Sequence, residues 1–292
     1  MSNELTKGII AGDDFIAETI LYGLINNGIE SPDDYYVVDD IKRHNYWRTK
    51  HKVKPIEEPL DFVSDAAVII LAFKPEDTDR ILAKISSKTR KEAVIVSVVR
   101  KLKIKEIENY LPNNRIIRLV INPSIISGAG LGAYVVGSQD KTTTEEMAQT
   151  VLSDLGTFIE VGSENELEKV RDFILANTFL SYIVTRAMID TGKNLGFTTE
   201  HAGIVADQIL KGASRTLVEL QDEGSVMFRD GLKNTKVINE AIHLIKEYGI
   251  YDSIERALTK KDASKIFTPY RDDDETEMFN MHYNWFDSMV NQ

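Results

Sequence analysis

The chain has 292 residues, of which 42% are hydrophobic and 28% charged, as is usual for a globular protein, and it is long enough for two domains. Its lack of cysteine excludes disulfides, thiolate catalysis and cysteine-ligated metals, and its net charge of -11 argues against nucleic acid or an anionic membrane as a partner. No apolar run is long enough to span a bilayer and no signal peptide is evident, so we expect a cytoplasmic protein.

The first part of the chain alternates short apolar runs with helical patterns. Helices are predicted at Asp14–Asn27, Glu76–Ile85, Ile104–Tyr110 and Thr143–Leu155. Strands are predicted at Gly8–Ala11, Tyr35–Val38, Ala67–Ala72, Ala93–Val98, Arg115–Ile121, Ala133–Val136 and Thr157–Val161. Strand–helix–strand repetition with short connections predicts a doubly wound parallel sheet of the Rossmann type over residues 1–162.

From Glu164 onward the pattern is helical. Glu164–Leu195 reads as one long helix with Gly196 as its C-terminal cap, and Thr199–Leu220 as another, with further helices near Lys236–Glu247 and Tyr251–Thr259. These helices are more apolar than one small domain can cover, so residues 163–265 are expected to form an all-helical domain that makes a homodimer or higher oligomer. A monomeric helical cap is the alternative. Residues 266–292 are predicted to form an extra amphipathic helix.

Several motifs, taken in order, resemble those of the pyrroline-5-carboxylate reductase family. The resemblance extends over about residues 7 to 260 and is carried by the segments Gly8–Glu18, Leu71–Asp77, Arg118–Ser124, Ser127–Gly130, Asp190–Gly196, Gly212–Ser214 and Phe228–Asp230. It implies a nucleotide-binding first domain, a dimerising helical second domain, and an enzyme that reduces a cyclic imine with NADH or NADPH. The ligand would lie in the cleft between the domains.

The expected phosphate-binding turn is degenerate. A Gly-x-Gly-x-x-Gly/Ala fingerprint would place glycines close to the pyrophosphate, at the start of the first helix. Here Ala11, Asp13 and Ile16 occupy those positions, and only Gly12 is nearby. The carboxylates of Asp13 and Asp14 would repel a diphosphate, although as helix caps they would stabilise the helix N-terminus. The candidate positions in this turn are Gly12, Asp13, Asp14 and Phe15.

Asp39 and Asp40 follow the second strand, where an acidic side chain can hydrogen-bond the ribose 2′-hydroxyl of NADH. The next residues, Lys42, Arg43 and His44, would instead suit the 2′-phosphate of NADPH. Plain turn residues are the third interpretation of the two aspartates. The cofactor is therefore expected to be NADP or NAD, with Asp39 as the candidate residue.

The third strand ends in Ala72-Phe-Lys74-Pro75, and the resemblance assigns the backbone here to the nicotinamide half of the cofactor. Pro75 is equally suited to the first turn of a helix. Asn122 matches the asparagine of the family's Asn-Thr-Pro motif, with the proline one place earlier, at Pro123. Ala72, Lys74, Pro75 and Asn122 complete the candidate cofactor residues.

The substrate motifs of the family are missing. Ile174–Thr178 replaces its Ser-Gly-x-Gly-Pro stretch, and Gly231–Ile238 replaces its Ser-Pro-Gly-Gly-Thr-Thr loop. Two interpretations remain for the polar residues near these segments: they build a polar pocket of a different shape, or they are ordinary polar residues of loops and helix ends. The residues are Asn177, Thr178, Lys233, Asn234 and Thr235. His201 is a candidate acid or base or a plain surface histidine, and no histidine spacing suggests a metal site. The catalytic residues are unknown.

Three functions follow from these residues. The first is a divergent NAD(P)-dependent reductase of a small imine or carbonyl compound other than pyrroline-5-carboxylate. The second is a non-catalytic scaffold or regulatory relative, which the joint loss of the phosphate turn and both substrate loops would suit. The third is a binder of a phosphate-free nucleoside ligand such as S-adenosylmethionine, which the acidic turn would tolerate.

Overall fold

The computed structural model describes residues 7–12, 14–26 and 31–232, together with residues 240, 243 and 247–249. Two compact units divide the chain between Leu180 and Ser181. The tail at 266–292, the helices expected near Lys236–Glu247 and Tyr251–Thr259, and most of the loop Gly231–Ile238 lie outside the described residues. Within the described residues, no helix combines the length and the hydropathy that crossing a membrane requires.

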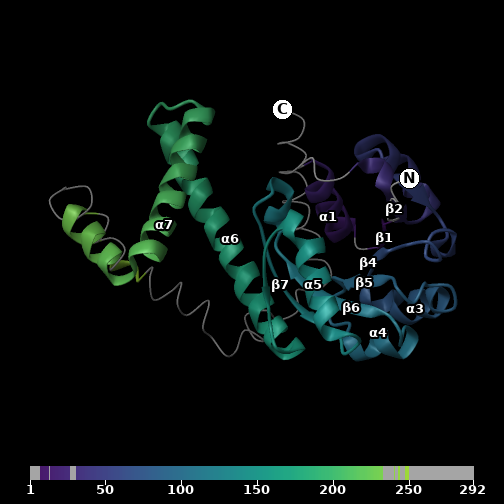
Figure 1. The fold of residues 1–292 in the computed structure, drawn as a ribbon. Coiled ribbons are helices and arrows are strands. Elements are labelled where there is room, and N and C mark those ends of the chain that lie inside the picture. Colours follow the sequence, from purple (N-terminus) through teal and green to yellow (C-terminus); the bar gives the residue numbers. More distant parts are fainter. Residues whose placement is uncertain are drawn as a thin grey trace. The chain divides into compact units, whose positions relative to one another are not determined.

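An eight-stranded sheet forms the centre of the first unit (Figure 1). Its spatial order is β3-β2-β1-β4-β5-β6-β7-β8, and every neighbouring pair is parallel except β6 and β7. The strands are β1 (Lys7–Ala11), β2 (Tyr35–Val38), β3 (Lys54–Ile56), β4 (Val68–Ala72), β5 (Val94–Ser97), β6 (Arg115–Ile121), β7 (Gly130–Val136) and β8 (Gly156–Glu160). The predicted Rossmann-type sheet is confirmed, with an antiparallel step at β7 that the sequence pattern did not reveal.

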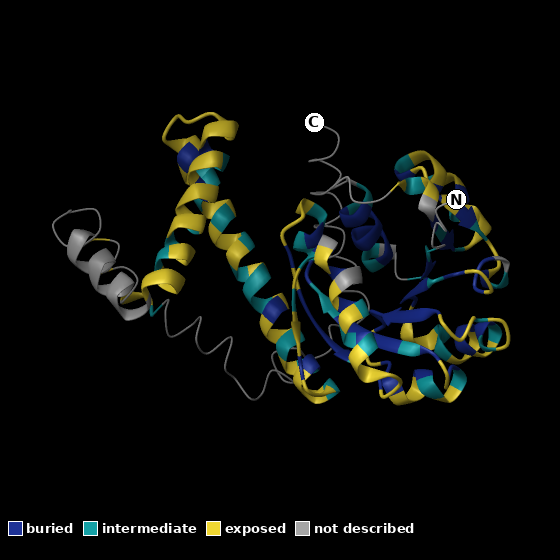
Figure 2. Cartoon of the chain, viewed as in Figure 1, coloured by how far each residue is buried: buried dark blue, intermediate teal, exposed yellow. Residues whose placement is uncertain are grey.

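Helices cover both faces of this sheet. One apolar core lies under α1 (Asp14–Asn26) and α5 (Lys141–Leu152). The other lies under α3 (Thr78–Ser86), α4 (Ile104–Tyr110) and the first turns of α6 (Glu164–Asn194). β4 and β5 are buried along their whole length because helices cover both their faces, as expected for the central strands of a parallel sheet (Figure 2).

The sequence pattern missed β3 and the segment before it. β3 has three residues, including Pro55, and it pairs only with β2 at the edge of the sheet, where a proline is tolerated. Between β2 and β3 the chain forms a 3-10 turn at Ile41–Arg43, the short helix α2 (His44–Tyr46) and a π-helical turn at Trp47–His51. None of these short turns has an apolar period long enough to recognise in a sequence.

The second unit contains the end of α6 and the helix α7 (Thr199–Leu232). Gly196 has φ +92° and ends α6, so its predicted role as a C-terminal cap is confirmed. Close packing between the helices follows from small residues: a Cβ on Gly192 would lie 3.0 Å from the Cβ of Ala202. The sequence places the domain boundary at residue 162, where the strand pattern ends, whereas the compact units divide inside α6.

Candidate functional site

The carboxyl ends of the parallel strands bring most of the candidate residues to one edge of the sheet. The connection from β1 runs to one side, toward β2, and the strand on its other side is β4, so the strand order reverses between β1 and β4. Crevices of open α/β sheets that bind ligands lie outside the carboxyl ends of the strands at such a reversal. Gly12 follows β1, Asp39 follows β2, Lys74 follows β4 and Asn122 follows β6.

Gly12 lies at the β1–β4 reversal and packs against the turn after β4. Its φ is +156°, and an added Cβ would lie 3.2 Å from both Cα and Cβ of Phe73. Only a glycine combines this backbone geometry with so close an approach. Asp14 is the first residue of α1 and Phe15 lies half-buried in its first turn, whereas Asp13 lies outside the described residues.

The turn after β4 offers backbone more than side chains. Ala72 and Phe73 are buried, while Lys74 and Pro75 are exposed at the edge. Pro75 begins a 3-10 turn that leads into α3, so the expectation that it starts a helix is confirmed together with its place at the edge. A ligand at the β1–β4 reversal would therefore meet the backbone of two tight turns.

Asn122 is buried and its amide holds three parts of the first unit together. Its Oδ1 accepts a hydrogen bond from the backbone N–H of Leu131 at 2.9 Å. Its Nδ2 donates to Oγ1 of Thr178 at 3.0 Å and lies 3.3 Å from Oγ of Ser124. This residue positions the end of β6 against β7 and α6, and Thr178 contributes to that contact.

The other polar candidates on the second part of the chain show local contacts. Nδ2 of Asn177 donates to the backbone oxygen of Phe173 within α6. The backbone N–H of His201 donates to Oγ1 of Thr198, which caps α7, and the His201 side chain is exposed. Lys233, Asn234 and Thr235 lie outside the described residues. Among the described residues, no group of three or more His, Asp or Glu side chains is placed to hold a metal ion.

Asp39, at the end of β2, has donors from its own chain on both carboxylate oxygens. Oδ1 accepts the backbone N–H of Asp40 at 2.8 Å. Oδ2 accepts Nε1–H of Trp47 at 2.7 Å and lies 3.1 Å from Nε of Arg43. The Asp39 side chain is 8% exposed, and the guanidinium of Arg43 lies over the rings of Tyr46 and Trp47.

A buried carboxylate on α1 fixes the segment that follows β2. Oε1 of Glu18 accepts hydrogen bonds from the Tyr46 hydroxyl at 2.6 Å and from Nζ of Lys50 at 2.9 Å, and Nε2 of His51 lies 3.0 Å away. Burial raises the pKa of Glu18, but the hydrogen bonds from His51, Tyr46 and Lys50 and the charge of Lys50 outweigh it and lower the pKa to about 2. The sequence analysis missed this cluster. Its only sequence signal is the run of cations and aromatic residues at 42–54.

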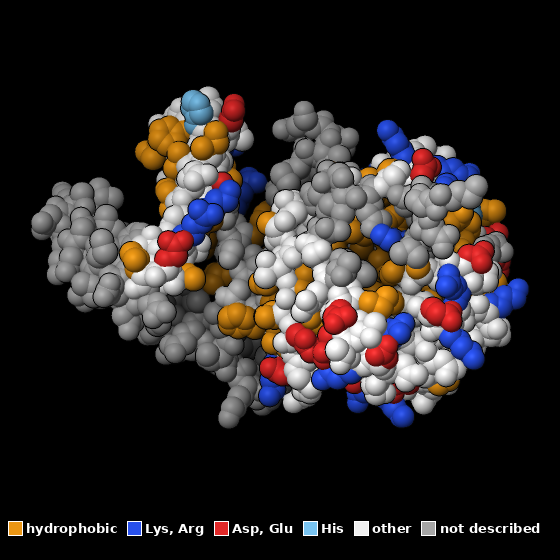
Figure 3. Space-filling view, in the orientation of Figure 1, with side chains coloured by type: hydrophobic (Ala, Val, Ile, Leu, Met, Phe, Trp, Pro, Cys, Tyr) orange, Lys and Arg blue, Asp and Glu red, His pale blue; other side chains and the backbone are white. Residues whose placement is uncertain are grey.

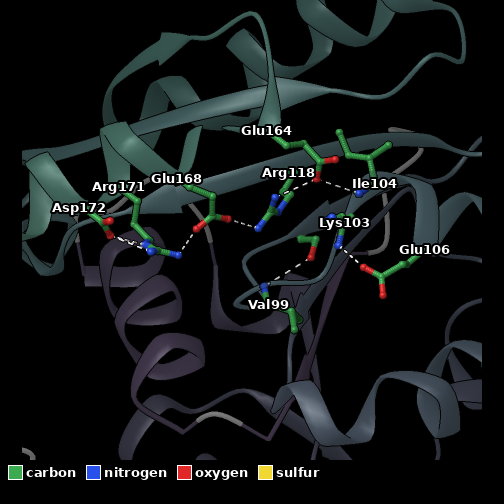
Figure 4. Close-up of polar contacts among 10 residues, drawn as sticks. Val99, Lys103, Ile104, Glu106, Arg118, Glu164, Glu168, Arg171 and Asp172 are labelled. Atoms are coloured by element: carbon green, nitrogen blue, oxygen red, sulfur yellow. Dashed lines mark hydrogen bonds and ion pairs between the residues drawn. The ribbon is translucent and has the colours of Figure 1, made fainter. Parts of the chain in front are cut away.

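A second buried charge anchors the start of α6 to the sheet (Figure 4). Arg118 lies in the middle of β6 with its side chain 5% exposed. Its Nη1 donates to Oε1 of Glu164 at 2.8 Å, and its Nη2 donates to Oε1 of Glu168. Oε1 of Glu164 also accepts the first backbone N–H of α4, at Ile104, at 3.0 Å. The first turns of α6 are therefore tied to β6 and α4, which explains why they belong to the first compact unit.

Comparison with known proteins supports the same family as the motifs. A family model described as NADP oxidoreductase coenzyme F420-dependent matches residues 7–101. Pyrroline-5-carboxylate reductase of Mycobacterium tuberculosis is 25% identical over 224 residues, which are 74% of this chain and 75% of that protein. Pyrroline-5-carboxylate reductase 1 of Bacillus spizizenii is 24% identical over 213 residues, covering 72% of this chain and 70% of the relative.

Solved structures of such reductases share the fold. The enzyme from Coxiella burnetii superposes with a TM-score of 0.68 at 21% identity, covering 88% of this chain and 95% of that one. The Plasmodium falciparum enzyme, solved with NADP bound, also gives 0.68, at 16% identity and with 87% and 94% covered. By sequence and by fold, the chain therefore resembles the pyrroline-5-carboxylate reductases.

Proposed function

We propose that this protein is an NAD(P)-dependent reductase that transfers hydride to a small imine or carbonyl compound other than pyrroline-5-carboxylate. The observation that carries the proposal is Gly12, which packs against Phe73 at the β1–β4 reversal with a geometry that excludes a side chain. A glycine in the turn after the first strand is what a dinucleotide site uses to let the backbone approach the diphosphate. The relatives named above are reductases, and one was solved with NADP bound.

Residues of this chain would bind and orient the dinucleotide rather than perform covalent chemistry. The bound nicotinamide would supply the hydride, so the protein's task is to hold the acceptor beside it and to exclude water. The backbone of the two turns after β1 and β4 would line the cofactor, and Asn122 would keep the end of β6 in place beside them.

The substrate side supports a different acceptor. Ile174–Thr178 lies inside the unbroken helix α6, where the backbone N–H groups serve the helix itself. These residues include neither glycine nor proline, and Asn177 and Thr178 bond to Phe173 and Asn122. The stretch therefore lacks the free backbone donors that a substrate carboxylate would need in the manner of the family.

We also propose that the protein forms a homodimer through the helices of its second part. Large apolar side chains on α6 and α7 are exposed in the single chain. The end of α6 and the helix α7 are called the hairpin below, and orange side chains mark it in Figure 3. They are Phe179, Ile183, Val184, Ile204, Val205, Ile209, Leu217 and Val218. A group of exposed large apolar side chains such as this is typical of a subunit interface.

Thermal unfolding of the full chain with NADPH, NADH or S-adenosylmethionine tests the ligand class. A ligand at 100 times its dissociation constant adds about 2.7 kcal/mol, which gives a clear upward shift. We expect a shift with a dinucleotide, and oxidation of NADPH with members of a panel of cyclic imines and ketones. A shift with S-adenosylmethionine alone would replace this proposal with the nucleoside-binding alternative. Turnover of pyrroline-5-carboxylate at about 1 per second or faster would overturn the claim about the acceptor.

A further inference from the structure

The proposed dinucleotide site leaves open which ribose it accepts, and the segment after β2 contains the groups that decide this. In sites that favour NADH, an acidic side chain at the end of this strand receives the ribose 2′-hydroxyl and repels a 2′-phosphate. Asp39 stands at that place in the sequence. Its contacts within the chain are not those of a free ribose acceptor.

The carboxylate of Asp39 is turned into the protein. Each oxygen takes a donor from the chain, and the side chain is only 8% exposed. The Nε1–H of Trp47, a residue with no exposed surface, holds Oδ2 at 2.7 Å. A ribose diol would have to displace this buried hydrogen bond or the ion pair with Arg43 to reach the same oxygen.

The negative charge of Asp39 is also balanced by the positive charge of Arg43, so it would repel a nearby 2′-phosphate less. Arg43 lies 3.1 Å from Oδ2, and its guanidinium carbon is 5.3 Å from the ring centre of Tyr46 and 5.5 Å from that of Trp47. An arginine that contacts two aromatic rings is already restricted in its motion, so it loses less freedom when it binds an anion. The side chain remains 29% exposed, so one part of it is accessible to a ligand.

The surroundings of Arg43 are basic although the whole chain carries a net charge of -11. Residues 41–54 contain no acidic residue, and Lys and Arg stand at 42, 43, 48, 50, 52 and 54. The exposed carboxylate that faces the same turn is Asp40, whose Oδ1 accepts the backbone N–H of Lys42 at 2.9 Å and so caps the turn. Lys42 is exposed beside Arg43. Two cations therefore accompany one exposed carboxylate at this point.

The segment is held in place rather than left loose. Glu18 on α1 bonds Tyr46, Lys50 and His51, three residues of the turns that carry the Arg43 platform. A cation for a phosphate is most effective when its support is already ordered before the ligand arrives.

We propose that Trp47, Asp39 and Arg43 together make the cofactor site selective for a dinucleotide with a 2′-phosphate on its adenosine ribose, so that NADPH binds in preference to NADH. In this arrangement Asp39 is a positioning residue for Arg43, and Arg43 and Lys42 receive the phosphate. This inference rests on the proposed dinucleotide function and adds the choice between the two cofactors.

Titration of the full chain with NADPH and NADH, and competition by 2′,5′-ADP and 5′-AMP, measures this choice. We expect wild type to bind NADPH at least tenfold tighter than NADH, and 2′,5′-ADP at least tenfold tighter than 5′-AMP. Arg43→Gln should lower the affinity for NADPH about tenfold and leave that for NADH within twofold. Arg48→Gln removes an exposed cation from the same segment and should leave the ratio unchanged.

Asp39→Asn separates the two roles of the aspartate by the sign of its effect. If Asp39 positions Arg43, the variant weakens NADPH binding several-fold and leaves NADH binding within twofold. If Asp39 were the ribose ligand, the loss of its charge would strengthen NADPH binding and weaken NADH binding, and that result would overturn the inference. Trp47→Phe keeps an aromatic ring near Arg43, removes the indole N–H donor from Oδ2 of Asp39, and should move the ratio toward NADH.

The possible failures are distinguishable. Equal binding of NADPH and NADH by wild type, or a preference for NADH, refutes the inference and leaves the proposed reductase function standing. Binding of neither dinucleotide refutes both. Unchanged NADH binding in Arg43→Gln and Asp39→Asn serves as the check that these variants are folded.

Discussion

The two compact units differ in how far their apolar side chains are buried. In the first unit, β4 and β5 are buried on both faces and two apolar cores flank the sheet. In the second, the hairpin of α6 and α7 buries small residues such as Ala202 and Ala206, while Ile183, Ile209 and others stay exposed. The first unit thus completes its core within one chain. The hairpin leaves large apolar side chains exposed, as a subunit surface does before it associates. We propose that a second copy of the same hairpin covers them.

The largest effect is expected from charging the hairpin. Ile183→Glu combined with Ile209→Glu would place carboxylates in an apolar interface from both subunits at once, without protein partners to hydrogen-bond them. We expect association to weaken at least 1,000-fold, about 4 kcal/mol. Light scattering at micromolar concentration should show a dimer for wild type and a 33 kDa species for the variant. Gln208→Glu, which adds a charge at an exposed polar position of α7, is the control, and a monomeric wild type would contradict the proposal.

The anchor of α6 in the first unit can be broken by Arg118→Met. Removal of this buried guanidinium takes one charged hydrogen bond from Glu164 and one from Glu168, which keep Ile104 N–H and Arg171, and the free energy of unfolding should fall by about 3 kcal/mol. Urea unfolding followed by circular dichroism measures the loss. Arg171→Met removes a cation that is 27% exposed and should cost about 1 kcal/mol or less. Equal losses in the two variants would show that burial of Arg118 is unimportant.

Glu18→Gln tests whether a buried charge stabilises the first unit, because it removes the carboxylate from the cluster of Tyr46, Lys50 and His51. Because the pKa of Glu18 is lowered from 4.5 to about 2, its ionised form stabilises the fold above pH 4.5, and this contribution is lost as the pH falls toward 2. The shift corresponds to about 3 kcal/mol at pH 7. Wild type should therefore lose more stability than the variant between pH 5 and pH 2, as followed by thermal unfolding. Parallel pH profiles would contradict this role of Glu18.

The smallest effects distinguish a glycine of the sheet from one of the hairpin. Gly12→Ala must keep a strained backbone and press its Cβ on Phe73, so it should cost about 1–2 kcal/mol and weaken dinucleotide binding. Gly212→Ala meets nothing within 4 Å on the exposed side of α7 and should gain up to about 1 kcal/mol. Thermal unfolding of both variants measures these changes. A stable Gly12→Ala with unchanged cofactor affinity would remove Gly12 from the proposed site.

The elements that the sequence predicts well are those with many neighbouring apolar residues. β2 and β6 have the predicted bounds, and α6 ends within one residue of its predicted end at Leu195. α7 runs to Leu232, beyond the predicted end at Leu220, and passes through Gly224 without a break. The turns at residues 41–51 were missed because Glu18, from a different helix, stabilises them.

For the candidate site, the positions of the residues could be predicted but their contacts could not. Gly12, Asp39, Ala72, Lys74, Pro75 and Asn122 were selected from the dinucleotide fingerprint and the family resemblance, and they lie at one edge of the sheet because parallel strands bring their carboxyl ends there. What each side chain contacts did not follow from its position. The amide of Asn122 is engaged with Leu131 and Thr178, which lie on different elements.

The sequence by itself determined most strands of the sheet, its longer helices and the apolar faces of α6 and α7, because these depend on periodic patterns within each segment. The tertiary structure decided the direction in which Asp39 points and the attachment of the first turns of α6 to the sheet. Both depend on hydrogen bonds between residues of separate elements, Trp47 with Asp39 and Arg118 with Glu164. A buried charge adopts the position in which its donors are found, and those donors are brought together only when the chain folds.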